Sequence, residues 1–68
     1  MHIAIVVNGE TRTIEAGRTV LALLEELKLD PSRVAVELNR EIVRQPAWAG
    51  TVLAAGARIE IVQFVGGG

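Results

Sequence analysis

The residues of greatest chemical interest are the three glycines that end the sequence, Gly66, Gly67 and Gly68. Consecutive glycines lose too much backbone entropy on ordering to hold a strand, so we expect a flexible tail. It would reach about 10 Å beyond Val65, at roughly 3.3–3.6 Å per residue. A glycine backbone enters a channel too narrow for any Cβ atom, which would carry the Gly68 carboxylate into another protein's site. An inert, frayed end is the competing interpretation, and the glycines alone do not decide between the two.

The remaining reactive side chains predict neither a catalytic nor a metal-binding set. The sequence has one histidine, His2, one serine, Ser32, and no cysteine. Without a histidine base for the serine or a carboxylate cluster for the histidine, nucleophilic catalysis and metal binding are not expected. The single tryptophan, Trp48, is more simply a plug over a sheet than a ligand-stacking group. We therefore expect a chain that is not an enzyme and holds no metal.

The apolar pattern breaks phase just before the glycines. Ile59 and Ile61 share one face of the expected last strand, whereas Val62 and Phe64 fall on the opposite, polar face. Large apolar groups on that face indicate a partner-docking patch beside the tail. The alternatives are a β-bulge that restores the phase, or a cover formed by the segment around the tryptophan.

Composition limits the classes of protein that this chain can be. The 68 residues allow one domain, which we place at residues 1–65, with the tail at 66–68. Half of the residues are hydrophobic and 3% are aromatic, which predicts a folded chain with an aliphatic core. A net charge of −1 without a basic cluster makes nucleic acid an unexpected partner. No apolar run is long enough to span a membrane, so we expect a soluble, cytoplasmic protein.

Two hairpins are expected from strands that flank turn-forming dipeptides. The expected strands are residues 3–7, 11–14, 34–38, 41–43 and 58–62. Asn8-Gly9 lies between the first two and is typical of two-residue hairpin turns. Asn39-Arg40 is expected to turn the second hairpin.

One helix is expected to cover this sheet. Thr19 can cap a helix that begins at Val20, where leucines follow at helical spacing. Pro31 disfavours helical backbone at the residue before it, so the helix should end at Lys28 or Leu29. Residues 46–53 lack strand alternation and are expected to form a short helical or irregular crossover. One helix on one sheet face predicts an α+β fold.

Taken in order, four segments resemble the bacterial sulfur carrier family of thiamine biosynthesis, the ThiS family. They read T-V-L-A-L-L-E-E-L, V-A-V-E-L-N, P-A-W-A and I-V-Q-F-V-G-G-G. The resemblance covers essentially the whole chain. It implies the ubiquitin-like β-grasp fold, a mixed sheet of four to five strands packed on one main helix.

The resemblance also implies a function. A partner related to E1 adenylyltransferases would consume ATP to adenylate the Gly68 carboxylate, and a sulfur-donating enzyme would supply the sulfur of a thiocarboxylate. Thiazole synthase would use that sulfur for the thiazole ring of thiamine. Gly66 and Gly67 would then be read by the partners, and the chain itself would bind no cofactor. Phe64 and Val65 carry over only as docking residues.

Related functions share this tail chemistry. The alternatives are the small subunit of molybdopterin synthase, a sulfur carrier for tRNA thiolation, and a ubiquitin-like modifier conjugated to proteins. An interaction domain with an inert glycine end is an alternative from a different class.

Overall fold

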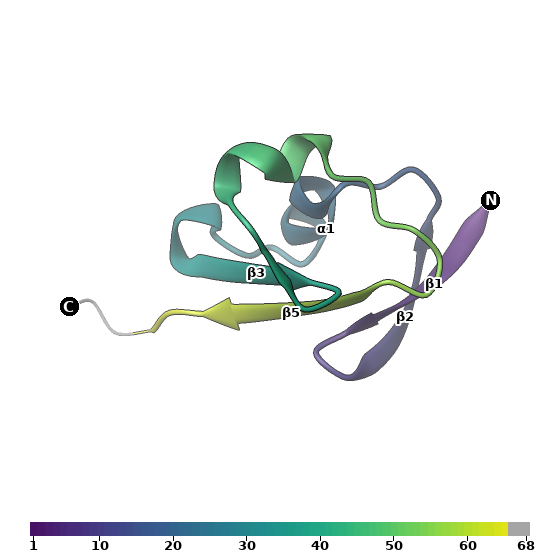
Figure 1. Cartoon of the computed structure of the whole chain (residues 1–68), viewed down its shortest axis with the longest axis horizontal. Helices are drawn as coiled ribbons and strands as arrows, with labels where there is room; N and C mark the ends of the chain where they lie inside the picture. The colour runs from purple at the N-terminus through teal and green to yellow at the C-terminus, as the bar shows by residue number, and fades with distance from the viewer. Residues whose placement is uncertain (66–68) are drawn as a thin grey trace.

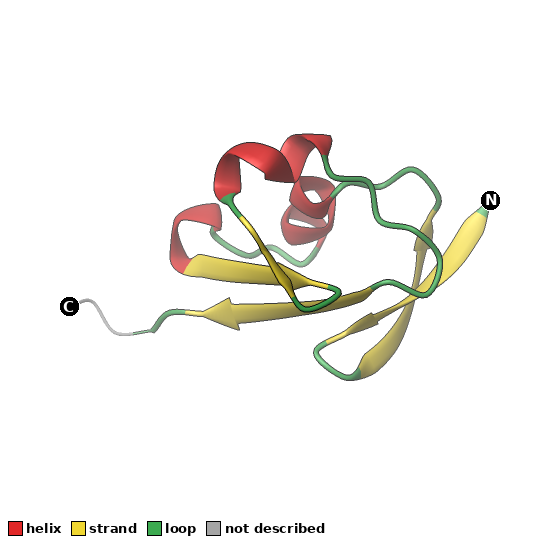
Figure 2. Cartoon of the chain, in the orientation of Figure 1, coloured by secondary structure: helices red, strands yellow, loops and turns green. Residues whose placement is uncertain are grey.

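A five-stranded mixed sheet forms the body of the protein, and all helical segments lie on one side of it (Figures 1 and 2). The structure is a computed structural model that describes residues 1–65. Its elements in chain order are β1 (His2–Val7), β2 (Glu10–Glu15), α1 (Val20–Glu26), η1 (Pro31–Arg33), β3 (Val34–Leu38), β4 (Glu41–Val43), η2 (Gln45–Gly50) and β5 (Arg58–Gln63). This is the predicted order of strands and main helix, and it confirms the β-grasp class.

The first and last strands meet in the middle of the sheet, whose order is β2-β1-β5-β3-β4. β1 and β5 are parallel, and the other neighbouring strands are antiparallel. β1 pairs with the first two residues of β5, Arg58 and Ile59, whereas β3 pairs with β5 as far as Gln63, so β5 continues along β3 to one end of the molecule (Figure 1).

Both hairpin predictions are confirmed. Asn8 and Gly9 have φ values of 49° and 84°, and Asn39 and Arg40 have values of 50° and 70°. Positive φ at both central residues is the geometry that matches the right-handed twist of the flanking strands. Glycine and asparagine adopt it with little strain, whereas Arg40 occupies it against its own preference.

The helix begins as predicted but ends early. Thr19 Oγ1 accepts a hydrogen bond from the N–H of Ala22 at 3.1 Å, which confirms the N-cap. The predicted end at Lys28 or Leu29 is wrong, because Lys28 turns into the left-handed region with φ 60°. Lys28 N–H then donates to the carbonyl of Glu25 and Leu29 N–H to that of Leu24, each at 3.0 Å. This pair of bonds is a Schellman motif, so α1 ends at Glu26 before Pro31 can act.

Pro31 instead begins η1, at the first position of this short 3₁₀ segment. The predicted crossover over residues 46–53 is a 3₁₀ segment, η2, followed by irregular chain.

The core lies between α1, η2 and one face of the sheet. It is almost entirely aliphatic, as composition predicts, and its buried members are Ile5, Val7, Ile14, Val20, Leu23, Leu24, Val34, Val36, Trp48, Leu53, Ala57, Ile59 and Ile61. Trp48 is 3% exposed and its Nε1–H donates to the carbonyl of Val43 at 2.7 Å. The structural role predicted for the tryptophan is therefore confirmed.

Candidate functional site at the exit of the last strand

Residues 1–65 contain no cluster of side chains that could hold a metal ion. No group of three or more histidine, aspartate or glutamate side chains is close enough in this part of the chain to hold a metal ion. His2 is exposed at the start of β1. Ser32 donates its hydroxyl to Asp30 Oδ1 at 2.8 Å, as part of the cap of η1. Hydrogen bonds from Ser32, with the Arg33 guanidinium nearby, hold the pKa of the Asp30 carboxyl below its ordinary value of 3.8.

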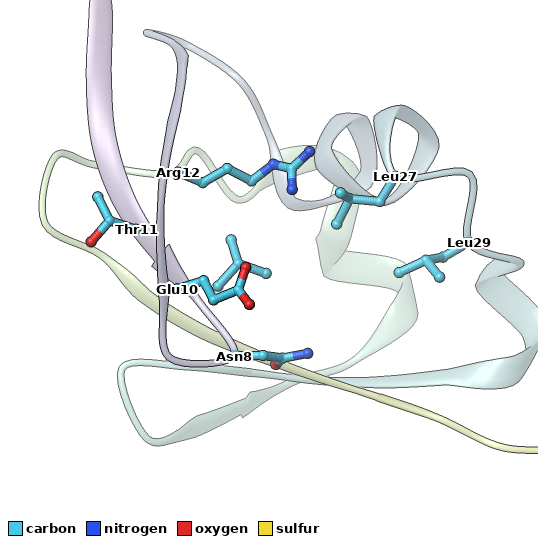
Figure 3. A pocket seen from close by; sticks show the side chains of 7 residues that line it. Asn8, Glu10, Thr11, Arg12, Leu27 and Leu29 are labelled. Atoms are coloured by element: carbon cyan, nitrogen blue, oxygen red, sulfur yellow. The ribbon is translucent and has the colours of Figure 1, made fainter.

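A hollow of about 340 Å³ lies between the β1–β2 turn and the end of α1. Figure 3 shows Glu10 and Arg12 of β2 extending toward the side of the hollow that Leu27 and Leu29 form. The hollow lies beside the point at which α1 ends, since Leu27 and Leu29 follow Glu26. Its lining contains no cysteine, serine or histidine.

The side chain of Asn8 holds β5 at Ile61, in the part of the strand beyond its pairing with β1. Asn8 Oδ1 accepts from the N–H of Ile61 at 2.7 Å, and Asn8 Nδ2 donates to the carbonyl of Ile61 at 3.1 Å. The backbone N–H of Asn8 also donates to the carbonyl oxygen of Ile59 at 2.9 Å. One turn residue therefore prolongs the β1–β5 pairing beyond the end of β1.

Sequence reasoning treated Asn8 only as a turn residue and missed this clamp. The partner, Ile61, is 53 positions away in the chain. Asparagine before glycine signals the turn whether or not its amide reaches another strand, so the local sequence carries no signal of the second role.

β5 remains held on its other side almost to the end of the described chain. Its pairing with β3 runs without a break from Leu38 and Ile59 to Val34 and Gln63. One step further, the N–H of Phe64 donates to the carbonyl of Arg33 at 2.7 Å. The strand is thus positioned up to the residue that precedes Val65.

The predicted docking residues are exposed. Val62 and Phe64 are each 56% exposed and Val65 is 85% exposed. The unbroken β3–β5 register shows that no bulge restores the phase, and Trp48 is buried in the core without covering these side chains. Both alternative interpretations of the phase break are therefore wrong. Docking at these residues stays a prediction.

The glycine residues lie outside the described part of the chain. Gly66, Gly67 and Gly68 were predicted to form a flexible tail that partners read, with the reactive carboxylate on Gly68. The division into a domain at residues 1–65 and a tail at 66–68 also stays a prediction.

None of the helices within residues 1–65 has the length and apolar character needed to cross a membrane.

The sheet order, the single main helix on one face and the central position of β5 define a ubiquitin-like β-grasp domain. Comparison with known proteins gives the family. The ThiS family model matches residues 5–68. The chain belongs to the ThiS family, which confirms the resemblance seen in the sequence.

Individual relatives agree with this assignment. The sulfur carrier protein ThiS of Escherichia coli (strain K12) is 33% identical over 64 residues, which cover 94% of this chain and 97% of that protein. The crystal structure of the thiamine biosynthesis protein ThiS from Geobacter metallireducens superposes with a TM-score of 0.83 at 33% identity. That alignment covers 97% of this chain and 100% of the other.

A third relative is much longer than this chain. A protein named thiazole synthase in Paramagnetospirillum magneticum (strain ATCC 700264 / AMB-1) is 48% identical over 64 residues. The match covers 94% of this chain and 20% of the relative. The chain therefore spans about a fifth of the length of the thiazole synthases that it matches.

Proposed function

We propose that this protein is the sulfur carrier for the thiazole ring of thiamine. The sulfur would be carried on the C-terminal carboxyl group, at Gly68. The observation that carries the proposal is the path of β5 in a ThiS-family fold. Hydrogen bonds hold the chain up to Phe64, and four residues then lead to Gly68. A strand held by hydrogen bonds and followed by a few residues would limit where the terminal carboxylate can lie. An enzyme that binds the domain would then find the carboxylate close to its own active site.

The chemistry begins with a carboxylate, which is a poor electrophile. A partner of the E1-like adenylyltransferase class joins the Gly68 carboxylate to AMP with release of pyrophosphate from ATP. A sulfide-level nucleophile, delivered by a sulfur-donating enzyme, then attacks the acyl carbon and AMP leaves. The product is a thiocarboxylate, whose sulfur is the nucleophile used by thiazole synthase.

In this scheme the chain is a substrate of its partners and has no enzymatic activity of its own. ATP is consumed by the adenylating partner, and the carrier itself binds no cofactor. Gly66 and Gly67 provide a backbone without Cβ atoms for the partner's narrow channel. The proposal includes a cytoplasmic location, where ATP and the partners would meet the carrier.

The docking surface in this proposal consists of Val62, Phe64 and Val65. They are large, apolar and exposed, and they lead directly into the glycines. An enzyme that binds the glycines would contact them at the same time, which would bury apolar area and fix the approach of the tail.

Thiazole synthase as the acceptor is supported by the long relative from Paramagnetospirillum magneticum. A carrier-like segment there belongs to a chain named thiazole synthase. Linking two modules in one chain raises the effective concentration of one for the other, which benefits modules that act on each other.

The test is ATP–pyrophosphate exchange by the adenylating partner, followed by thiazole formation with thiazole synthase. The proposal predicts exchange that requires this chain and is lost when Gly68 is deleted. Equal exchange with the deleted chain would contradict it. Exchange without thiazole formation would retain the carrier and move the acceptor to another class, such as a pterin or a tRNA.

A further inference from the structure

The open face of the sheet, opposite α1, carries a cluster of apolar and acidic side chains from β3, β4 and β5. Ala35 lies directly across from Val62, and Glu37 lies directly across from Glu60. Ile42 of β4 is the partner of Glu37 on the other side. Side chains at opposed positions share one face of a sheet, so these five residues form one cluster. Ile42 is 77% exposed.

The two glutamates that face each other, Glu37 and Glu60, are expected to lower the stability of the isolated protein. Like charges directly opposite each other on neighbouring strands destabilise a sheet. The ion pairs found among residues 1–65 are Arg18–Glu26 and Asp30–Arg33, so neither Glu37 nor Glu60 has a cation within 4.0 Å. Arg58 shares their face, two positions before Glu60, but makes no such contact.

The cluster is also concave. A hollow of about 210 Å³ is lined by Ala35, Val36, Glu37, Ile42, Glu60 and Val62. Apolar side chains contribute most of this lining, and the two carboxylates are its only charged groups. A long side chain with an aliphatic stem and a cationic head matches this combination, because the stem packs on apolar surface while the head meets the carboxylates.

We infer that the hollow between Glu37 and Glu60 receives an arginine or lysine side chain of the adenylating partner. The inference rests on the proposed function and adds the chemistry by which the partner recognises the sheet. Val62 belongs both to the hollow and to the docking surface beside the tail, so a protein that takes the tail also covers the hollow.

Charge complementarity favours the adenylating enzyme as this partner. Its active site must hold the polyphosphate of ATP, which requires a positive potential where the tail enters. The carrier has a net charge of only −1, so its attraction to that surface depends on a local patch. Glu37 and Glu60 supply such a patch in the hollow that Val62 also lines.

The experiment compares Glu37→Gln/Glu60→Gln with a matched double variant, Glu10→Gln/Glu25→Gln. Both raise the net charge by two, but Glu10 belongs to the β1–β2 hairpin and Glu25 to α1 on the opposite side of the sheet. The readouts are kcat/KM and kcat for ATP–pyrophosphate exchange with the adenylating partner, at low and high salt, together with Tm.

The inference predicts opposite effects on binding and stability. In the Glu37→Gln/Glu60→Gln variant, kcat/KM falls about tenfold at low salt with kcat unchanged, and the difference shrinks as salt screens the charges. Its Tm rises by about 1–3 °C because the like-charge pair is gone. The matched variant keeps the wild-type kcat/KM.

Three results would overturn the inference. Equal losses in both double variants would show a general charge effect. Wild-type exchange with an unchanged kcat/KM in the Glu37→Gln/Glu60→Gln variant would remove the hollow from recognition and leave the proposed function standing, whereas no exchange with the wild-type chain would remove both. A wild-type dimer in sedimentation that the variant dissociates would assign the hollow to a second copy of the chain.

Discussion

The two faces of β5 have opposite characters although they belong to one strand. Ile59 and Ile61 point into the core and are 1% and 8% exposed. Glu60 and Val62 alternate with them on the open face, where Val62 is 56% exposed. One face of the strand therefore contributes to folding, while the other remains available to a partner beside the chain that leads to the glycines. This separation predicts that substitutions at adjacent positions change folding and recognition independently.

The largest expected effect lies beyond both faces, at the glycines. Gly67→Ala, or deletion of Gly68, should reduce adenylation by about 10²-fold or more, because a Cβ atom or a missing residue misplaces the reacting carboxyl group. Thermal unfolding should not change, since the buried core lies between Ile5 and Ile61. The assay pairs ATP–pyrophosphate exchange with calorimetry.

Gly50→Ala is the matched control for these glycine variants. Gly50 is exposed, and a Cβ atom there would meet no atom within 4 Å. This variant should fold and be adenylated like the wild type. A Gly67→Ala variant that unfolds at a clearly lower temperature would show that the tail contributes to the fold.

The comparison between the two faces is sharpest at the neighbours Ile61 and Val62. Ile61→Ala should lower the free energy of unfolding by about 2–4 kcal/mol, because it opens a cavity in the core. Val62→Ala should lower it by less than about 1 kcal/mol, since its side chain is already half exposed. Denaturant titration measures both values.

Substitutions on the open face should weaken partner binding more than they lower stability, which is the reverse of the effect expected for a core substitution. Val62→Ala and Phe64→Ala should each weaken binding of the folded chain to the adenylating enzyme by roughly tenfold, as expected for apolar anchors of an interface. Isothermal titration calorimetry provides the measurement. A large loss of stability in Phe64→Ala, with unchanged binding, would assign Phe64 to the fold.

A smaller effect is expected where Asn8 holds β5. Asn8→Ala removes both side-chain bonds to Ile61 and should cost about 1–3 kcal/mol, because the backbone groups of Ile61 lose their partners. Asn39→Ala is the control: Asn39 has nearly the same φ, 50° against 49°, but accepts a single bond from Arg58 at an exposed site. Equal losses of stability would mean that the turn conformation, and not the clamp, is responsible.

The smallest effect is a pH dependence far from the open face. The pKa of Asp30 is held below 3.8 in the folded chain, so the folded state binds its proton less readily than the unfolded state. Asp30 therefore contributes stability above about pH 4, and this contribution is lost as the pH falls through the lowered pKa. Asp30→Asn should lower Tm slightly at pH 7 and leave it unchanged near pH 2. A difference that persists at the lower pH would contradict this origin.

Most of the fold could be predicted because local signals and long-range packing agree. Asn8-Gly9 and Thr19 act through backbone groups a few residues away, and the leucine spacing in α1 marks its buried face. The early end of α1 could not be predicted, since it depends on Lys28 adopting a conformation that glycine favours. The Asn8 clamp was missed because its partner is remote in sequence.

In the candidate site, too, the features set by local sequence could be predicted and those set by contacts between distant segments could not. The phase break at Val62 and Phe64 was visible because strand periodicity fixes which face each residue takes. The juxtaposition of Glu37 and Glu60 was not visible, because it depends on the register between β3 and β5, which no local pattern of either strand determines.

The most direct test of the account is the intact mass of the protein after incubation with ATP, a sulfide source and the adenylating partner. The account predicts that one oxygen is exchanged for sulfur, that fragmentation places the change at Gly68, and that the Ile61 to Val65 segment is unmodified. An unchanged mass, with a partner that is active on another carrier of this family, would contradict the assignment of Gly68 as the site that carries sulfur.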